Sequence, residues 1–268
     1  MQKRILILGA TGTVGASIHR QLSSCNNLEI WGTYCSRRQS DSSSMIRFSV
    51  ENPDKIRPVL QKVRPDIVIS SLRGDFDRQL TVHKIIADYL SANHGKIIYI
   101  STANVFDGNC EKPHYEDDTR NSDSDYGQFK IQCEDLLKKR LESRAVILRI
   151  PFVWGKNSPR MWAVKNGCEN GELEIYTEFS SNHVADLQIA RTIRWITEKE
   201  KEGTFHVGTS DVIEYQAFIK RLIAAMGEKE PRFLCQKEPG VMAVLSSRKD
   251  IPDSLNWDSE KLIAYLTH

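Results

Sequence analysis

The sequence of 268 residues predicts an α/β protein, in which a doubly wound parallel sheet of the Rossmann type carries a smaller C-terminal lobe. Three observations predict this fold. Short β-branched runs alternate with longer amphipathic runs through the first 150 residues, as in a parallel sheet flanked by helices. A glycine-rich turn directly follows the first apolar run. After Arg149, prolines and glycines interrupt the alternation, so a second part of the chain begins there.

The expected strands are almost continuously apolar, as strands are when helices cover both faces of a sheet. They are predicted at residues 4–8, 29–34, 66–70, 96–101 and 145–149, with a weaker sixth at 45–50. Helices are predicted between them at about 13–24, 53–63, 76–93 and 125–142, and later a helix at 184–199, a strand at 203–209 and a helix that ends on Gly227. We therefore expect a dinucleotide-binding part at 1–150, to which 183–208 returns, and a substrate-binding lobe from 151–182 and 209–268.

Composition and charge exclude several classes of protein. The formal net charge is only +2 and the basic residues are dispersed, which argues against a nucleic-acid partner. Near the N-terminus the uninterrupted apolar run covers only residues 5–8, too short for a signal-peptide core or a membrane span. The six cysteines lie far apart without a C-x-x-C pair, so we expect reduced thiols and no metal site. A soluble cytoplasmic protein is the expectation.

The glycine turn is the first candidate functional segment. Gly9-Ala10-Thr11-Gly12-Thr13-Val14-Gly15 lies between the first strand and the first helix. Such a string also occurs in ordinary strand-to-helix turns. At this position, however, glycines permit a tight turn and close approach of a pyrophosphate to the free N–H groups of the helix. We expect Gly9, Thr11, Gly12, Thr13, Val14 and Gly15 to bind a dinucleotide.

The end of the second strand indicates which dinucleotide binds. No carboxylate stands there to bind a ribose 2′-hydroxyl, and Arg37 and Arg38 follow immediately. Two guanidinium groups offer bidentate contacts to a 2′-phosphate. Solvated loop arginines are the alternative reading. We expect NADP(H) to be preferred, with NAD(H) possible.

Tyr126 and Lys130 stand four residues apart on a predicted helix, where any two polar residues are neighbours. The pair can also be catalytic, because an ammonium close to a tyrosine hydroxyl favours the phenolate. Thr102 follows a central strand, at the end of the sheet where ligands bind, and its hydroxyl can bond a substrate carbonyl. The three residues together point to one acid–base site.

With the glycine turn, KIIYISTANVFDG (96–108) and Tyr126-x-x-x-Lys130 in this order, the chain resembles the extended short-chain dehydrogenase/reductase superfamily. More narrowly, it is similar to the dTDP-4-dehydrorhamnose reductase family, sugar-nucleotide reductases that take NADPH or NADH. LRIPFVWG (148–155), HVADLQIA (183–190) and LNWDSEKL (255–262) extend the resemblance over nearly the whole chain. It implies a catalytic set of Thr102, Tyr126 and Lys130.

The resemblance also implies binding residues. For the cofactor these are Ser70, Ser71, Leu72, Tyr126, Lys130 and Pro151, and for the substrate Thr102, Asn104, Val153, Trp154 and Arg160. The segment 152–165 is the expected floor and wall of the substrate site. Trp154 and Trp162 would offer flat apolar faces, and Lys156, Arg160 or Lys165 would meet a diphosphate, unless the tryptophans are core and the cations solvated.

Two segments depart from the family. Ala103-Asn104 stands where the family usually has an acidic residue and an aromatic one, which makes the elimination chemistry of related dehydratases improbable. SLRGDFDRQ (71–79) replaces the usual small, alanine-rich stretch after the strand at 66–70. The glutamates that some members use for magnesium are not recognisable, and no metal is expected.

The leading functional prediction is an NADPH-dependent reductase of a nucleotide-linked 4-keto (deoxy)sugar, with Tyr126 as proton donor. A catalytically weak NADP-binding regulatory or redox-sensing protein of the same fold is the main alternative. An epimerase that retains NAD and a general carbonyl reductase are further readings. A homodimer is compatible with the sequence.

Overall fold

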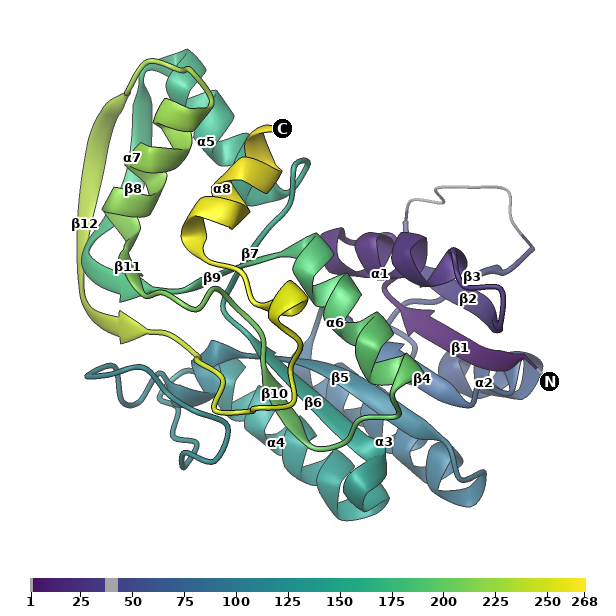
Figure 1. The fold of residues 1–268 in the computed structure, drawn as a ribbon. Helices are drawn as coiled ribbons and strands as arrows, with labels where there is room; N and C mark the ends of the chain where they lie inside the picture. The colour runs from purple at the N-terminus through teal and green to yellow at the C-terminus, as the bar shows by residue number, and fades with distance from the viewer. Residues whose placement is uncertain (1, 37–42) are drawn as a thin grey trace.

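A computed structural model describes residues 2–36 and 43–268 (Figure 1). Its centre is a sheet of seven parallel strands in the order β10-β6-β5-β4-β1-β2-β3. The strands are β1 (Lys3–Leu8), β2 (Leu28–Tyr34), β3 (Met45–Arg47), β4 (Ile67–Ser70), β5 (Lys96–Thr102), β6 (Ala145–Ile150) and β10 (Thr204–His206). Strand order reverses between β1 and β4, and at such a reversal doubly wound sheets bind their ligands.

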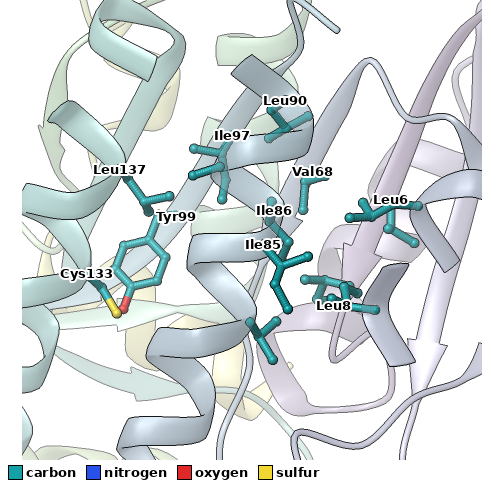
Figure 2. Close-up of a cluster of buried hydrophobic side chains, with 14 of the residues drawn as sticks. Leu6, Leu8, Val68, Ile85, Ile86, Leu90, Ile97, Tyr99, Cys133 and Leu137 are labelled. Atoms are coloured by element: carbon teal, nitrogen blue, oxygen red, sulfur yellow. The ribbon is translucent and has the colours of Figure 1, made fainter. Parts of the chain in front are cut away.

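Helices cover both faces of this sheet because successive residues of each strand point to opposite sides. Ile5 and Ile7 pack with α1 (Thr13–Ser23) and α6 (Asp186–Glu198). Leu6 and Leu8 face the other layer. That layer consists of α2 (Ile56–Val63), α3 (Phe76–Ala92) and α4 (Asp125–Leu141). Figure 2 shows its core, in which the Tyr99 hydroxyl points toward the sulfur of Cys133.

A smaller lobe stands at one end of the sheet (Figure 1). Its three-stranded sheet pairs β8 (Glu172–Ser181) antiparallel with β11 (Ile213–Glu214) and parallel with β12 (Arg232–Met242). The helices are α5 (Pro159–Asn170), α7 (Tyr215–Ala225) and α8 (Ser259–Thr267). A parallel pair, β7 (Phe152–Trp154) and β9 (His183–Ala185), connects the lobe to the large sheet. Short 3₁₀ turns occur at Pro53–Lys55, Ala103–Phe106, Glu142–Arg144 and Asp253–Leu255.

The predicted fold class is confirmed, and most strands lie within one or two residues of their expected bounds. The predicted sixth strand is shorter than expected, since β3 ends at Arg47. The predicted helix at 53–63 begins as a 3₁₀ turn. α5 was not predicted as a helix, although Ser158 caps it and Pro159 occupies its first turn. The division at residue 150 remains our proposal. In residues 2–36 and 43–268 no helix combines the length and apolarity that a membrane crossing requires.

Candidate active site

The glycine turn joins β1 to α1 and leaves the start of α1 open to an anion. Gly9 has a φ of +76°, and a Cβ there would lie 2.9 Å from the carbonyl oxygen of Ser71. A Cβ on Gly15 would collide with the carbonyl oxygen of Gly9. Gly12 caps the helix without a side-chain hydrogen bond, and its first turn holds no acidic residue. The free N–H groups and the helix dipole therefore favour a phosphate, and the turn fits the predicted dinucleotide.

A cavity of about 1000 Å³ opens at the carboxyl ends of the strands, between the large sheet and the small lobe. We call its lining from residues 9–130 the sheet wall. Residues 150–160 with Met242 form the lobe wall. Among the described residues, the charged side chains in the lining are Arg73, Lys130 and Arg160, and no carboxylate joins them. Such a cavity attracts anionic ligands.

Most of the predicted site residues meet in this cavity. Its lining includes Gly9, Thr11, Gly12, Thr13, Val14, Gly15, Ser71, Leu72, Thr102, Asn104, Tyr126, Lys130, Pro151, Val153 and Arg160. Ser70 is a correction to the predicted cofactor set. It is 1% exposed, and its hydroxyl is hydrogen-bonded at 2.8 Å to Nε2 of the buried His83, on the helix side of β4. Arg37 and Arg38 lie outside the described residues, so the cofactor preference stays a prediction.

Thr102 and Tyr126 reach the cavity from a strand end and a helix start. Thr102 is the last residue of β5, and its hydroxyl donates to Oδ1 of Asn104 at 2.9 Å. The backbone N–H of Asn104 donates in turn to the Thr102 oxygen at 3.2 Å. Tyr126 lies in the first turn of α4, where Ser124 caps the helix by accepting from the N–H of Gly127.

Lys130 follows Tyr126 by one helical turn and is almost fully buried, with 6% of its surface exposed. Its Nζ donates to the carbonyl oxygen of Ile100 at 2.9 Å and lies 4.6 Å from the centre of the Tyr99 ring. Burial lowers the pKa of Lys130 to about 8, and the charge of Arg73 acts in the same direction. The Glu134 carboxylate opposes this shift. The ammonium is thus buried among protein groups, and it loses its proton more readily than the ammonium of an exposed lysine does.

The Tyr126 phenol differs from the sequence expectation. Lys130 lies 5.7 Å from the Tyr126 ring centre and donates to a backbone carbonyl. Burial raises the pKa of Tyr126 above its usual value, while the neighbouring Thr102 hydroxyl and the charge of Arg73 act against that rise. Desolvation therefore outweighs the nearby cations, and the phenol stays protonated at neutral pH. A protonated tyrosine is the form that donates to a carbonyl oxygen.

Asp107 fixes the approach to α4. Its carboxylate accepts from the hydroxyl of Ser122 at 2.6 Å and from the N–H of Asp123 at 2.8 Å, and it also accepts from the hydroxyl of Ser124. Burial alone raises the pKa of Asp107, but these hydrogen bonds hold it below its usual value. The carboxylate therefore anchors the cap residue of the helix that carries Tyr126.

A buried ion pair supports the sheet wall from behind. The carboxylate of Glu134 accepts from Nε of Arg149 at 3.1 Å and from Nη2 at 2.9 Å, and also from the hydroxyl of Ser101 at 2.5 Å. Glu134 and Arg149 are 0% and 2% exposed. Burial alone raises the pKa of Glu134, but the hydrogen bonds and charge of Arg149 lower it below its usual value. The pair joins α4 to β6, and Ser101 extends the contact to β5, one residue before Thr102.

The lobe wall brings one cation to the cavity. The Arg160 guanidinium lies 4.5 Å from the centre of the Phe152 ring, on the first turn of α5. Burial raises the pKa of the adjacent Tyr215, and the Arg160 charge and hydrogen bond oppose that shift. Pro151, Val153 and Asn157 line the same wall. Arg160 is thus presented by aromatic rings with its charge available to a ligand.

Trp154 requires a correction as a predicted substrate contact. It is 0% exposed, and its indole N–H donates to Nδ1 of His183 at 3.1 Å. Its ring packs against Phe218 in the lobe core, so it offers no face to the cavity. Trp162 is 61% exposed, and it does not line the cavity either. Lys156 and Lys165 lie outside the lining as well.

Several lining residues were not predicted from the sequence. One group lies near the end of β2 and after β3, and consists of Thr33, Tyr34, Cys35, Phe48, Ser49 and Val50. A second consists of Arg73, Gly74, Phe76 and Gln79, in the segment that departs from the family. Positions at strand ends could have indicated the first group. Nothing in the local sequence indicates Met242, which β12 brings from the far end of the chain. Within the described residues, no cluster of three or more His, Cys, Asp or Glu side chains is placed to hold a metal.

Comparison with known proteins adds the family. A family model described as RmlD substrate binding domain matches residues 75–243, more than half of the chain. The zebrafish (Danio rerio) methionine adenosyltransferase 2 subunit beta is 27% identical over 164 residues, which are 58% of this chain and 49% of that protein. The match thus spans about half of that relative's length.

A Shigella flexneri dTDP-4-dehydrorhamnose reductase is 26% identical over 237 residues, covering 80% of this chain and 76% of that enzyme. Among solved structures, the dTDP-4-dehydrorhamnose reductase of Bacillus anthracis in complex with NADP superposes with a TM-score of 0.80 at 18% identity, covering 99% of each chain. The family predicted from the glycine turn and the Tyr126–Lys130 pair is confirmed, and the chain belongs to the RmlD substrate binding domain family.

Proposed function

We propose that this protein is an NADPH-dependent oxidoreductase that reduces the carbonyl group of a nucleotide-linked 4-keto (deoxy)sugar. One observation carries the proposal. Thr102, Tyr126 and Lys130 meet in a single cavity with the open start of α1, so an acid–base set faces a phosphate-binding turn. The reductase names of relatives support the reaction class, and the NADP complex of a structural neighbour supports the cofactor.

The cofactor fits the residues of the sheet wall. A side chain at Gly9 or Gly15 would collide with the neighbouring backbone, so the tight turn requires glycine at both positions. The uncapped N–H groups of α1 suit a diphosphate. NADPH, when bound, supplies the hydride that reduces a carbonyl carbon. Lys130 holds its ammonium at the side of the cavity where Tyr126 lies, in reach of hydroxyl groups of a ribose.

Tyr126 acts as the proton donor. Its raised pKa keeps the phenol protonated until negative charge develops on the substrate oxygen. Thr102 stands beside it and donates its hydrogen to Asn104 in the free protein. A substrate carbonyl that displaces Asn104 as the acceptor receives hydrogen bonds from both Thr102 and Tyr126.

The substrate is proposed to lie against the lobe wall. Arg160 offers the guanidinium for its diphosphate, and Val153 and Asn104 flank the reacting ring. No carboxylate in the described lining repels such a ligand. The same wall has no matching charge for a neutral carbonyl compound, so a free ketone is the poorer substrate.

Tyr126→Phe tests the proposal. The variant should bind NADPH as the wild type does and lose turnover of a nucleotide-linked 4-keto sugar by about 10²- to 10⁴-fold, the range for a general acid. Loss of NADPH absorbance measures turnover, and calorimetry measures binding. Tyr115→Phe is the matched control, because Tyr115 is exposed and lies outside the cavity lining. A Tyr126→Phe variant as fast as this control would refute the assignment.

A regulatory role is the second candidate, because the zebrafish relative is named as a subunit of another enzyme. Under this reading the protein binds NADP(H) and turns over no substrate. The intact set of Thr102, Tyr126 and Lys130 favours catalysis. Wild-type protein that binds NADPH tightly, yet reduces neither nucleotide-linked nor free carbonyl compounds, would favour the regulatory role.

A further inference from the structure

Arg73 is a cavity cation without a partner in the described part of the chain. It lies three residues beyond the end of β4 and is exposed, and no hydrogen bond or ion pair to a described residue engages its guanidinium. The positive charge of Arg73 lowers the pKa of Lys130 and opposes the rise in the pKa of Tyr126. An anion bound between these two cations would lower their mutual repulsion.

The backbone around Arg73 is held firmly. The carbonyl oxygen of Gly74 accepts from Nε2 of Gln79 at 2.7 Å, and Gln79 is only 3% exposed. Gly74 has a φ of +128°, and a Cβ there would lie 2.6 Å from a methyl group of Val50. A side chain at this position would meet both backbone strain and a steric contact. The turn that presents Arg73 therefore belongs to the folded structure and is not a loose loop.

The start of α3 anchors the same turn from its other side. Asp75 caps the helix by accepting from the N–H of Arg78 at 2.9 Å. The Phe76 ring stacks on Phe129 of α4 with centres 4.8 Å apart and planes at 7°. This stack ties the turn to the helix that carries Tyr126 and Lys130. The backbone of Arg73 is consequently positioned before any ligand arrives, which reduces the backbone entropy lost on binding.

Arg73 lies on the sheet wall near the glycine turn. Ser71, two residues before it, touches Gly9 so closely that a Cβ on Gly9 would approach the Ser71 carbonyl oxygen. Arg160 stands on the opposite wall and suits a substrate. The two arginines thus lie on opposite walls of the same cavity.

We propose that Arg73 binds the diphosphate of the dinucleotide cofactor and completes the phosphate site formed by the glycine turn. The proposal rests on the cofactor binding of the proposed function, but not on the identity of the sugar or on turnover. Arg73 would supply a charged fork on the side of the diphosphate that faces away from the start of α1. Its place in the segment that departs from the family explains why the family pattern did not indicate it.

Calorimetric titration of Arg73→Met with two probes tests this inference. NADPH contains the diphosphate, whereas adenosine 2′-monophosphate carries the adenosine and the 2′-phosphate alone. The variant should bind NADPH about 10- to 100-fold more weakly, the range for a charge-assisted contact, and bind adenosine 2′-monophosphate as the wild type does. Unchanged binding of the second probe also shows that the variant is folded.

Arg78→Met is the matched control, since Arg78 belongs to the same segment, is exposed, and pairs with Glu51 outside the cavity lining. Equal NADPH affinity of the Arg73→Met and Arg78→Met proteins would overturn the proposal. So would an unchanged NADPH affinity with a raised KM for the nucleotide sugar, which would assign Arg73 to the phosphate of the substrate. Wild-type protein that binds NADPH but has no reductase activity would refute the proposed reaction and leave this inference standing.

Discussion

The two walls of the cavity are built in different ways. The sheet wall consists of strand ends and helix starts around one parallel sheet, and the buried Glu134 and the half-buried Asp107 support it. The lobe wall consists of β7, the start of α5 and a residue of β12, and aromatic rings support it. The first wall holds the proposed catalytic groups in fixed positions. The second offers a surface whose composition can follow the substrate, as loops on a rigid scaffold often do.

The largest expected effect tests the support of the sheet wall. Glu134→Gln leaves the buried Arg149 without its carboxylate and should lower the free energy of unfolding by about 3–5 kcal/mol. Glu198→Gln is the control, because Glu198 pairs with Arg194 at the surface and should cost about 0–1 kcal/mol. Urea unfolding measures both. A similar loss of unfolding free energy in the two variants would contradict this difference between the walls, because the sheet wall would then not depend on its buried ion pair.

Glu134 also predicts a dependence of stability on pH. Its pKa is lowered in the folded protein, so its stabilisation is complete above the ordinary glutamate pKa of about 4.3. It is lost as the pH falls through the lowered folded value. The wild type should therefore lose more stability on acidification than Glu134→Gln.

The next effect tests the lobe wall. Arg160→Ala should raise the KM for a nucleotide-linked keto sugar by about 10- to 100-fold, because a charge-assisted contact to the diphosphate is lost. The affinity for NADPH should not change. Steady-state kinetics and calorimetry give the two values. Lys165→Ala is the control, since Lys165 belongs to the same helix but not to the lining. A loss of NADPH affinity in Arg160→Ala would mean that the walls do not separate their ligands.

The preference between NADPH and NADH tests whether the cofactor side of the cavity also binds a 2′-phosphate. If Arg37 and Arg38 bind the 2′-phosphate, Arg37→Ala or Arg38→Ala should reduce the preference for NADPH over NADH by about 1–3 kcal/mol. Dissociation constants for both cofactors measure it. Wild-type protein with equal constants would remove the 2′-phosphate site from the sheet wall.

The smallest effect concerns pH and Lys130. Its pKa of about 8 predicts that kcat/KM declines as the pH rises past that value, since the charged ammonium is the working form. Lys130→Arg keeps a positive charge at every accessible pH, so its residual activity should lose this alkaline limb. A limb that persists unchanged in Lys130→Arg would assign the titration to another group.

The sequence predicted the sheet wall well because parallel strands end at one edge. Alternation of apolar runs placed the strands, and Thr102 at the end of one of them was therefore expected at the edge of the sheet where ligands bind. The prediction was less precise about which side of the sheet each side chain faces. Ser70 and Ser71 point to opposite sides of the sheet, and only Ser71 reaches the cavity.

The lobe wall was predicted less well because its burial depends on distant segments. Trp154 is covered by Phe218 of α7, which no local pattern near residue 154 reveals. Met242 reaches the cavity through a long strand pairing with β8. The direction of the Tyr126 pKa was missed for a related reason. Spacing gives the distance to Lys130, but desolvation depends on everything that packs around the ring.

The return of the chain to the large sheet sets an order of assembly. α6 and β10 complete the sheet, yet the lobe segment from β7 to β9 is synthesised before them. Val146 and Leu148 on β6 pack in one cluster with Ile189 and Ile193 of α6. A nascent chain that has emerged only as far as β6 therefore exposes this apolar strand until β7 to β9 and then α6 have also been translated. The speed of translation through residues 151–198 thus sets how long this face of the sheet stays uncovered.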